Sequence, residues 1–106
     1  MENEYSITNF IMIEKHKKGL ISKLNIMQDY ASKGYHVYNE MNNSGPVDFV
    51  AIHPDKVDVV LVESKTDSFR KKGTRVHRVL SPAQKKLGVK MVYYDTETKR
   101  VFSTEK

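Results

Sequence analysis

The sequence predicts a single α/β domain with a central mixed β-sheet, flanking helices and the element order αβββαβ(β). A chain of 106 residues can enclose one hydrophobic core but not two. Its first third shows helical periodicity, and three segments typical of strands follow in succession. A short helical signature then separates these segments from two more apolar ones. A strand meander followed by a crossover helix and a further strand produces a mixed sheet with helices against it.

The first helix is expected to carry one apolar face. Its members are Ile13, Leu20, Leu24, Met27 and Ala31. Gly19 interrupts this pattern, so the helix starts either near Lys17 or near Asn9, and Gly34 ends it. The polar residues 1–12 are expected to be frayed or only loosely docked against the single domain that the whole chain forms.

Three strands are expected next, because their residues alternate or form short apolar runs bounded by turn residues. They are residues 35–41, 47–52 and 58–62. The segment 42–46 (Asn-Asn-Ser-Gly-Pro) is a turn by composition, and Pro54 fixes the backbone of the turn between the second and third strands. The second and third strands therefore form a predicted hairpin.

A second helix is expected to begin after Ser81 as its N-cap, with Pro82 at its first position, and to end at Gly88. Strands at 91–94 and 100–103 follow, separated by a polar turn. These elements complete the predicted sheet.

Two acids are expected to meet at the open end of the hairpin. Asp48 stands among the apolar residues of the second strand, and the third strand runs directly into Glu63, Ser64 and Lys65. Two carboxylates at the edge of an apolar sheet repel each other and lose solvation, unless a cation lies between them. The pair therefore indicates a metal site. The alternative is that all three charged residues are solvated strand ends, with Lys65 neutralising Glu63.

Positive charge is concentrated directly after these acids. The chain has a net charge of +5, but residues 66–90 carry +7, which leaves −2 for the remainder. The basic residues of this segment are Arg70, Lys71, Lys72, Arg75, Arg78, Lys85, Lys86 and Lys90. A basic segment beside candidate metal ligands favours a polyanionic partner, most simply a nucleic-acid backbone. The alternative is a solvated loop that happens to be basic.

Composition excludes several other classes of protein. The chain has no cysteine, which excludes a disulfide framework and a thiolate zinc site. It has no apolar run of about 18 residues and no signal-peptide pattern, so an intracellular, cytoplasmic protein without a membrane span is expected. The histidines have no ligand-like spacing.

Asp48, followed fifteen residues later by Glu-Ser-Lys at 63–65, resembles the PD-(D/E)XK nuclease superfamily. The likeness is greatest to its small Holliday-junction resolvase-like and phage-type members. Pro46 stands two residues before Asp48 rather than beside it, which departs from the motif. Because the predicted element order over residues 17–103 also matches, the resemblance implies a restriction-endonuclease-like fold.

The resemblance also implies a role for each residue of the motif. Asp48 and Glu63 would bind a metal ion, and the backbone carbonyl of Ser64 would be a further ligand. Lys65 would orient or activate the attacking water and offset charge on the phosphate. Gln84 stands where several members place a helical glutamine that faces the site; the alternative is an ordinary exposed helix residue.

One position of the first helix departs from the superfamily. Members commonly have a glycine there, followed four residues later by a glutamate that helps to hold metal. In this chain Gly19 is followed by Lys23, and Glu14 is too far upstream to be the obvious replacement. Lys23 is then either an extra cation directed at the phosphate or a sign that catalysis was lost.

The expected function is that of a Mg²⁺-dependent DNA endonuclease, with Mn²⁺ as a substitute. Mg²⁺ held by two carboxylates makes a bound water more acidic and neutralises charge on the reacting phosphate. A domain this small offers little surface for reading bases. We therefore expect selectivity for branched or structured DNA, or help from a partner, rather than a long duplex recognition sequence. The alternatives are a catalytically inactive nucleic-acid-binding module of the same fold and an RNA endonuclease. The residues expected to contact nucleic acid are Lys23, Arg70, Lys71, Lys72, Arg75, Arg78 and Lys85.

A homodimer is expected if both strands are cut, because that requires two active sites. The sequence has more aromatic surface than one small sheet obviously needs to bury, and part of this surface is a candidate dimer interface. The residues concerned are Tyr35, Val37, Tyr38, Tyr93, Tyr94 and Phe102.

Overall fold

A computed structural model describes residues 7–42, 44–67 and 79–103, with side chains from Glu14 onward. Its elements are α1 (Ile7–Ser32), β1 (His36–Asn39), β2 (Phe49–His53), β3 (Asp58–Thr66), α2 (Pro82–Leu87), β4 (Lys90–Asp95) and β5 (Arg100–Phe102). The order of helices and strands is αβββαββ, so the predicted fold class is confirmed. No helix in the described part of the chain is long and apolar enough to cross a membrane.

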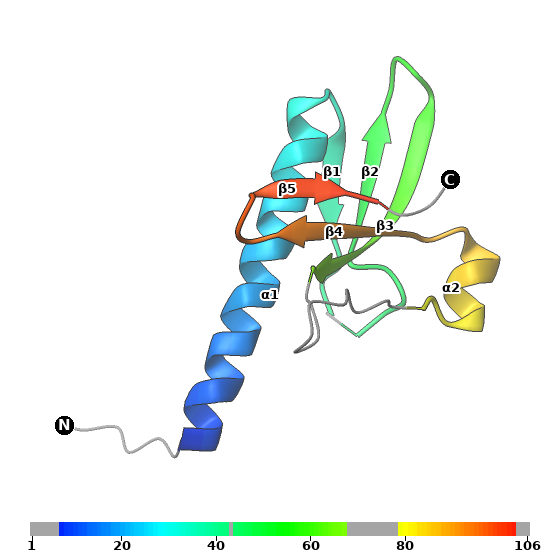
Figure 1. Cartoon of the computed structure of the whole chain (residues 1–106). Coiled ribbons are helices and arrows are strands. Elements are labelled where there is room, and N and C mark those ends of the chain that lie inside the picture. The colour runs from blue at the N-terminus through cyan, green and yellow to red at the C-terminus, as the bar shows by residue number, and fades with distance from the viewer. Residues whose placement is uncertain (1–6, 43, 68–78, 104–106) are drawn as a thin grey trace.

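The five strands form one mixed sheet in the order β1-β2-β3-β4-β5. Only β3 and β4 pair in parallel, and the other three pairs are antiparallel. A parallel pair requires a crossover, and α2 lies within that connection, away from α1 (Figure 1). The crossover brings the end of β3 and the start of α2 to the same region of the molecule.

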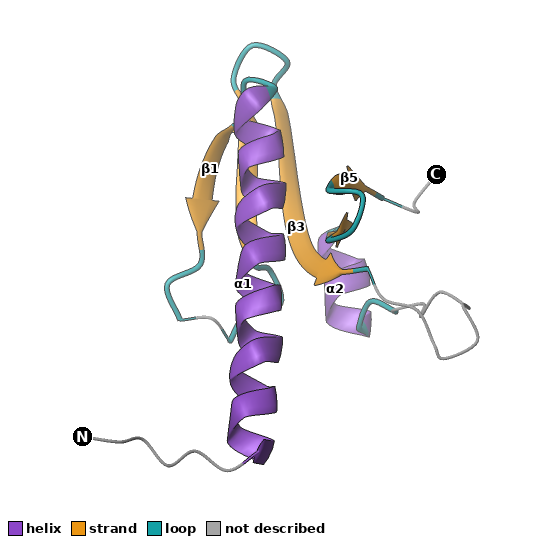
Figure 2. Ribbon diagram, turned by 60° about the vertical axis from the view of Figure 1, so that its left-hand side comes forward, coloured by secondary structure: helices purple, strands orange, loops and turns teal. Residues whose placement is uncertain are grey.

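Helix α1 packs along one face of the sheet, and its N-terminal half extends beyond the sheet (Figures 1 and 2). The helix already begins at Ile7, so residues 7–12 are helical although their composition predicted fraying. Gly34, in the left-handed conformation with φ of 94°, follows its last turn as predicted. The helix is thus much longer than the part that the sheet can cover.

The hydrophobic core lies between α1 and this face of the sheet. Its buried members are Ile26, Tyr30, Phe49, Ala51, Val62, Val92 and Tyr94. Phe49 has no exposed surface, and its ring meets that of Tyr30 edge to face, with the ring centroids 5.9 Å apart.

The prediction of which α1 residues are buried was largely wrong. Leu20 and Leu24 are 57% and 53% exposed, and Ala31 is also exposed, whereas Met27 packs against the core. The side chain of Ile13 lies outside the described residues. Among the α1 side chains that the structure describes, the buried ones are instead Ser22, Ile26 and Tyr30, at a spacing of four. Ser22 is buried because its hydroxyl is 2.6 Å from that of Thr66 on β3, a polar contact that apolar periodicity does not detect.

The aromatic residues do not form one exposed surface. Tyr93 and Tyr94 are buried, and the ring of Tyr93 stacks on that of Phe102 with a centroid distance of 5.5 Å. Tyr35 is half-buried and packs against the core, and only Tyr38 is mostly exposed. Tyr93 and Tyr94 are therefore not available to a dimer interface, because the sheet uses them for its own packing.

Gly19→Ala is expected to raise the free energy of unfolding by roughly 0.5–1 kcal/mol, because glycine is unfavourable inside a helix. A Cβ at this position would have no described atom within 4 Å. Urea denaturation followed by circular dichroism measures the change. Gly34→Ala is the contrasting variant, because its Cβ would lie 2.8 Å from Nε2 of His53 on a backbone with positive φ, so it should destabilise the protein. Equal effects of the two variants would contradict this interpretation.

Candidate functional site

Asp48 and Glu63 lie side by side where β2 meets β3. The antiparallel register of β2 and β3 ends with Phe49 opposite Val62; Asp48 directly precedes Phe49, and Glu63 directly follows Val62. The Asp48 N–H donates to the carbonyl of Val62 at 2.8 Å, and the Asp48 carbonyl accepts from the N–H of Glu40 at 3.2 Å. The backbone of Asp48 is therefore held on both sides, and the predicted convergence of the two acids is present.

Ser64 fixes the carboxylate of Asp48. Its backbone N–H and its hydroxyl both donate to Oδ2 of Asp48, each at 2.7 Å. The sequence motif assigns Ser64 only a backbone role, because its middle position accepts any residue. The hydroxyl contact was therefore missed, and only the folded hairpin reveals it. Oδ2 accepts from two donors, whereas Oδ1 accepts no hydrogen bond from the described residues and is available to a ligand.

The surroundings of Glu63 disfavour the charged form of its carboxylate. Its side chain is only 16% exposed, and its Oε2 lies 3.2 Å from Nζ of Lys65. Burial raises the pKa of Glu63 above its ordinary value, and the neighbouring charge of Asp48 raises it further. The ion pair with Lys65 and a hydrogen bond from Gln84 lower the pKa but do not cancel the rise. A cation between the two acids would remove this penalty.

Gln84 joins α2 to the site. Ser81 and Gln84 form the predicted start of α2 as a capping box, in which the Ser81 N–H donates to Oε1 of Gln84 at 2.9 Å. The amide of Gln84 also donates to the carbonyl of Pro46 at 2.8 Å, which ties α2 to the segment before β2. Gln84 thus lies beside Glu63, is only partly exposed and stabilises the start of α2.

An open pocket of about 700 Å³ lies between α1 and the end of β3. Its lining residues are Lys15, His16, Gly19, Leu20, Lys23, Asp48, Glu63, Ser64 and Lys65. Lys23 therefore lies in the same pocket as the two acids, whereas Glu14 does not line it. In the described part of the chain no group of three or more His, Cys, Asp or Glu residues is arranged to hold a metal ion.

Of the other predicted nucleic-acid-binding residues, the structure describes Lys85, which does not line this pocket. Lys85 is exposed in the last turn of α2. Arg70, Lys71, Lys72, Arg75 and Arg78 lie outside the described residues. Lys15 and His16 line the pocket but were missed by sequence reasoning; the signal that could have found them is their helical spacing from Gly19 and Lys23.

The residues present fit a small divalent cation. Asp48 and Glu63 offer carboxylate oxygens, which are the ligands that Mg²⁺ prefers, and Mg²⁺ binds through one or two carboxylates while keeping several waters. The raised pKa of Glu63 supports this fit, because burial first and the neighbouring charge of Asp48 second disfavour its charged form, which a cation would stabilise.

Glu63→Gln is expected to make the metal-free protein more stable at pH 7. Because the pKa of Glu63 is raised in the folded state, folding favours the protonated form. The contribution of Glu63 to the stability of the wild type is therefore greatest below its ordinary pKa of 4.5, and it is lost as the pH rises through the raised pKa. Urea unfolding in EDTA between about pH 4 and pH 8 should show the advantage of the variant growing with pH. A difference that does not depend on pH would contradict the assignment.

Neither a protein-family model nor a curated protein matches the sequence. Among solved structures, the chain is similar to that of a bacterial homing endonuclease, I-Ssp6803I, with a TM-score of 0.63. The match covers 83% of this chain and 68% of that chain, and the two are 20% identical in sequence. At this identity, the two proteins share the fold.

Proposed function

We propose that the protein is a metal-dependent DNA endonuclease of the PD-(D/E)XK type, which hydrolyses phosphodiester bonds. The observation that carries this proposal is the pairing of Asp48 with Glu63 beside Lys65 in one open pocket. The fold that the chain shares with a bacterial homing endonuclease supports it. The raised pKa of Glu63 supports a cation between the acids.

In this proposal the chain's own residues bind, orient and balance charge. Asp48 and Glu63, with the carbonyl of Ser64, would hold Mg²⁺ or Mn²⁺. When bound, the ion makes a coordinated water more acidic and stabilises negative charge on the phosphate. The hydroxyl and N–H of Ser64 hold the Asp48 carboxylate in one orientation. Lys65 places a positive charge near the phosphate, where charge increases during the reaction.

The proposed substrate is branched or duplex DNA, and the proposed assembly is a homodimer. A small domain has little surface for reading base edges, which favours recognition of DNA shape. Two copies supply two sites for cutting both strands. Among the aromatic residues that the structure describes, Tyr38 on the edge strand β1 is 55% exposed and is available for such an interface.

A second candidate is a binding module of the same fold that has no catalytic activity. Lys23 favours it, because this lysine lies in the pocket where the resembled enzymes have a third acid. Lys23→Glu separates the two functions. In an active enzyme the change alters rate or metal preference, whereas in an inactive module it restores some cleavage.

Incubation with branched, duplex and single-stranded DNA tests the proposed function. Cleavage is expected in Mg²⁺ or Mn²⁺, and none in EDTA. Binding is measured separately in Ca²⁺. Wild-type protein that binds branched DNA tightly but leaves it intact in both Mg²⁺ and Mn²⁺ would replace the endonuclease with the binding module.

A further inference from the structure

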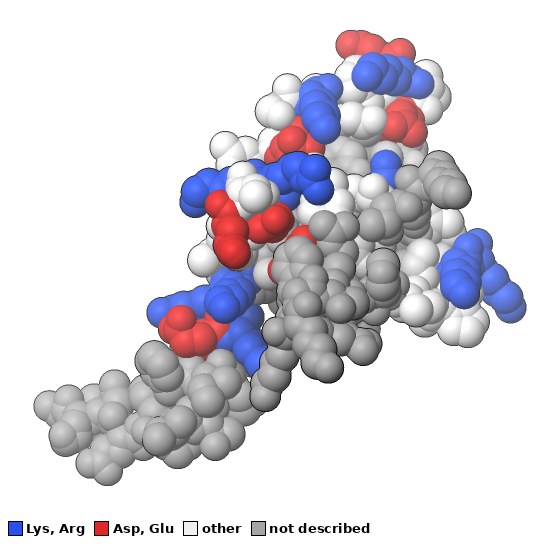
Figure 3. Space-filling view, viewed as in Figure 1, with Lys and Arg blue, Asp and Glu red and all other residues white. Residues whose placement is uncertain are grey.

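Helix α1 presents a row of lysines next to the acid pair. Figure 3 shows Lys and Arg side chains over the part of α1 that extends beyond the sheet. Lys15 and Lys18 are exposed and lie three residues apart, so they are neighbours on the helix surface. Lys23 lies about two turns after Lys15 and lines the pocket of Asp48 and Glu63.

A second open pocket, of about 570 Å³, continues this surface away from the acid pair. Its lining residues are Lys15, Lys18, Gly19, Ser64, Lys65, Thr66, Asp67 and Thr96. The two pockets share Lys15, Gly19, Ser64 and Lys65, so they adjoin and form one groove between α1 and the end of β3. Gly19 has no side chain to fill the groove where the two pockets meet.

Polar contacts fix α1 at this position. The Thr66 hydroxyl lies 2.6 Å from that of Ser22 and 3.5 Å from the carbonyl of Lys18. Ser22 is only 1% exposed, so the contact is sheltered from water. The lysine row therefore belongs to a helix segment that is docked directly against the strand end that carries Glu63 and Lys65.

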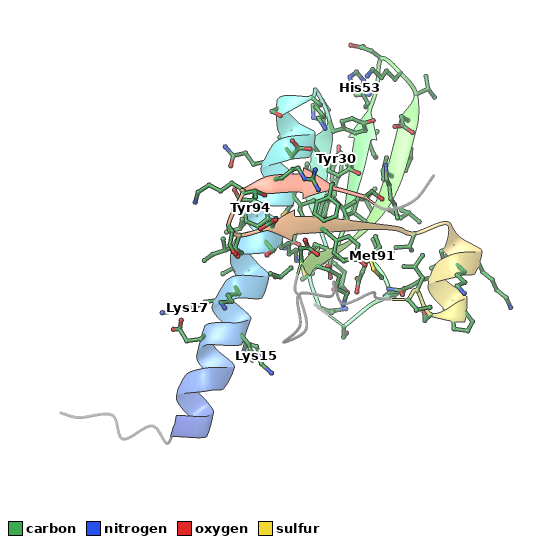
Figure 4. The ribbon with its side chains drawn as sticks, viewed as in Figure 1. Lys15, Lys17, Tyr30, His53, Met91 and Tyr94 are labelled. Carbon is green, nitrogen blue, oxygen red and sulfur yellow. The ribbon has the colours of Figure 1, made fainter. Side chains whose placement is uncertain are left out.

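The lysines that face the groove differ from those that face away. Lys17 pairs with Glu14 at 3.6 Å, and Lys33 pairs with Asp29 at 2.9 Å. Figure 4 shows Lys15 and Lys17 on opposite sides of the helix. Among the described residues, no carboxylate lies within ion-pair distance of Lys15, Lys18 or Lys23. Asp67 lines the second pocket but is buried. The groove therefore has cations whose counter-charge must come from elsewhere.

We propose that Lys15 and Lys18, together with Lys23, bind neighbouring phosphates of one duplex DNA strand and guide that strand across Asp48 and Glu63. The inference rests on the proposed function for the position of the scissile phosphate, but the binding itself requires no catalysis. From Lys15 to Lys23 the helix rises about 12 Å at 1.5 Å per residue, which corresponds to roughly three base steps of B-DNA. A phosphodiester backbone is a regular row of single negative charges and matches this row of lysines.

Salt-dependent binding of a fluorescent DNA duplex in EDTA tests the proposal. The variant is Lys15→Gln/Lys18→Gln, and the matched control is Lys17→Gln/Lys33→Gln, which removes the same charge from paired lysines. Each phosphate contact contributes roughly 0.9 to the steepness with which the logarithm of the binding constant falls against the logarithm of the salt concentration. The variant loses two contacts, so this slope should become shallower by about two. The variant should also bind DNA about tenfold or more weakly at about 0.1 M salt. The control should behave like the wild type, and Lys15→Arg/Lys18→Arg should retain binding. Circular dichroism confirms that each variant is folded.

Each remaining outcome decides the proposal. Equal losses in the variant and the control would overturn it, because net charge rather than the groove would then determine binding. Failure of the wild type to bind DNA would also overturn the proposal. So would displacement of the DNA by polyglutamate at equal charge concentration. Wild-type protein that binds through Lys15 and Lys18 but does not cut would leave this inference standing and reject the endonuclease alone.

Discussion

Alanine in place of Asp48 is expected to abolish Mg²⁺-dependent cleavage of DNA. Loss of a metal ligand removes several kcal/mol of charge stabilisation in the transition state, which corresponds to a rate loss on the order of 10³-fold or more. Glu63→Ala should have the same effect, because the two carboxylates lie side by side at the strand end. Single-turnover cleavage assays in Mg²⁺ measure both losses, and DNA binding in Ca²⁺ should largely persist.

Two further variants make this test specific. Asp55→Ala is the control, since Asp55 is an exposed acid in the turn between β2 and β3. It should cleave at the wild-type rate. Asp48→Asn keeps an oxygen that can accept from Ser64 and so separates loss of charge from loss of structure. Full activity of Asp48→Ala or Glu63→Ala would reject the nuclease proposal.

Glu63→Gln separates stability from activity at the same residue. The variant should be inactive and yet more stable than the wild type in EDTA at neutral pH, because the raised pKa of Glu63 reflects a charge that folding disfavours. This combination is expected of a group retained for chemistry rather than for packing.

Phe49→Ala, one residue from Asp48, is expected to have the largest effect on the fold. Phe49 is fully buried between α1 and the sheet. Its truncation should cost about 3–5 kcal/mol through lost burial and the cavity left behind. That is a large part of the roughly 5–15 kcal/mol that stabilises a domain of this size. Urea denaturation followed by circular dichroism measures the loss.

Val59→Ala is the matched control for this prediction. Val59 lies on β3 but is mostly exposed, so its truncation should cost less than about 1 kcal/mol. A loss at Phe49 as small as that at Val59 would contradict the core described above.

The sequence by itself determined the fold class and the meeting of the two acids. Alternating apolar segments, the turn around Pro54 and the cap at Ser81 are local signals, and they specify a hairpin and a crossover helix whatever lies further away. The pairing of β2 with β3 brings Asp48, which directly precedes β2, and Glu63, near the end of β3, into the same pocket.

Only the tertiary structure decided which face of α1 is buried and what surrounds the acids. Apolar periodicity selected Leu20 and Leu24, but the face of α1 that packs on the sheet carries Ser22, Ile26 and Tyr30, so the two leucines remain exposed. Ser22 is buried in their place because Thr66 supplies a hydrogen-bonding partner from another element. The contacts of Ser64 with Asp48, and the position of Lys15 beside the acid pair, likewise depend on segments brought together by folding. Side chains from separate segments carry no local pattern, so their proximity is decided by packing and hydrogen bonding across the core.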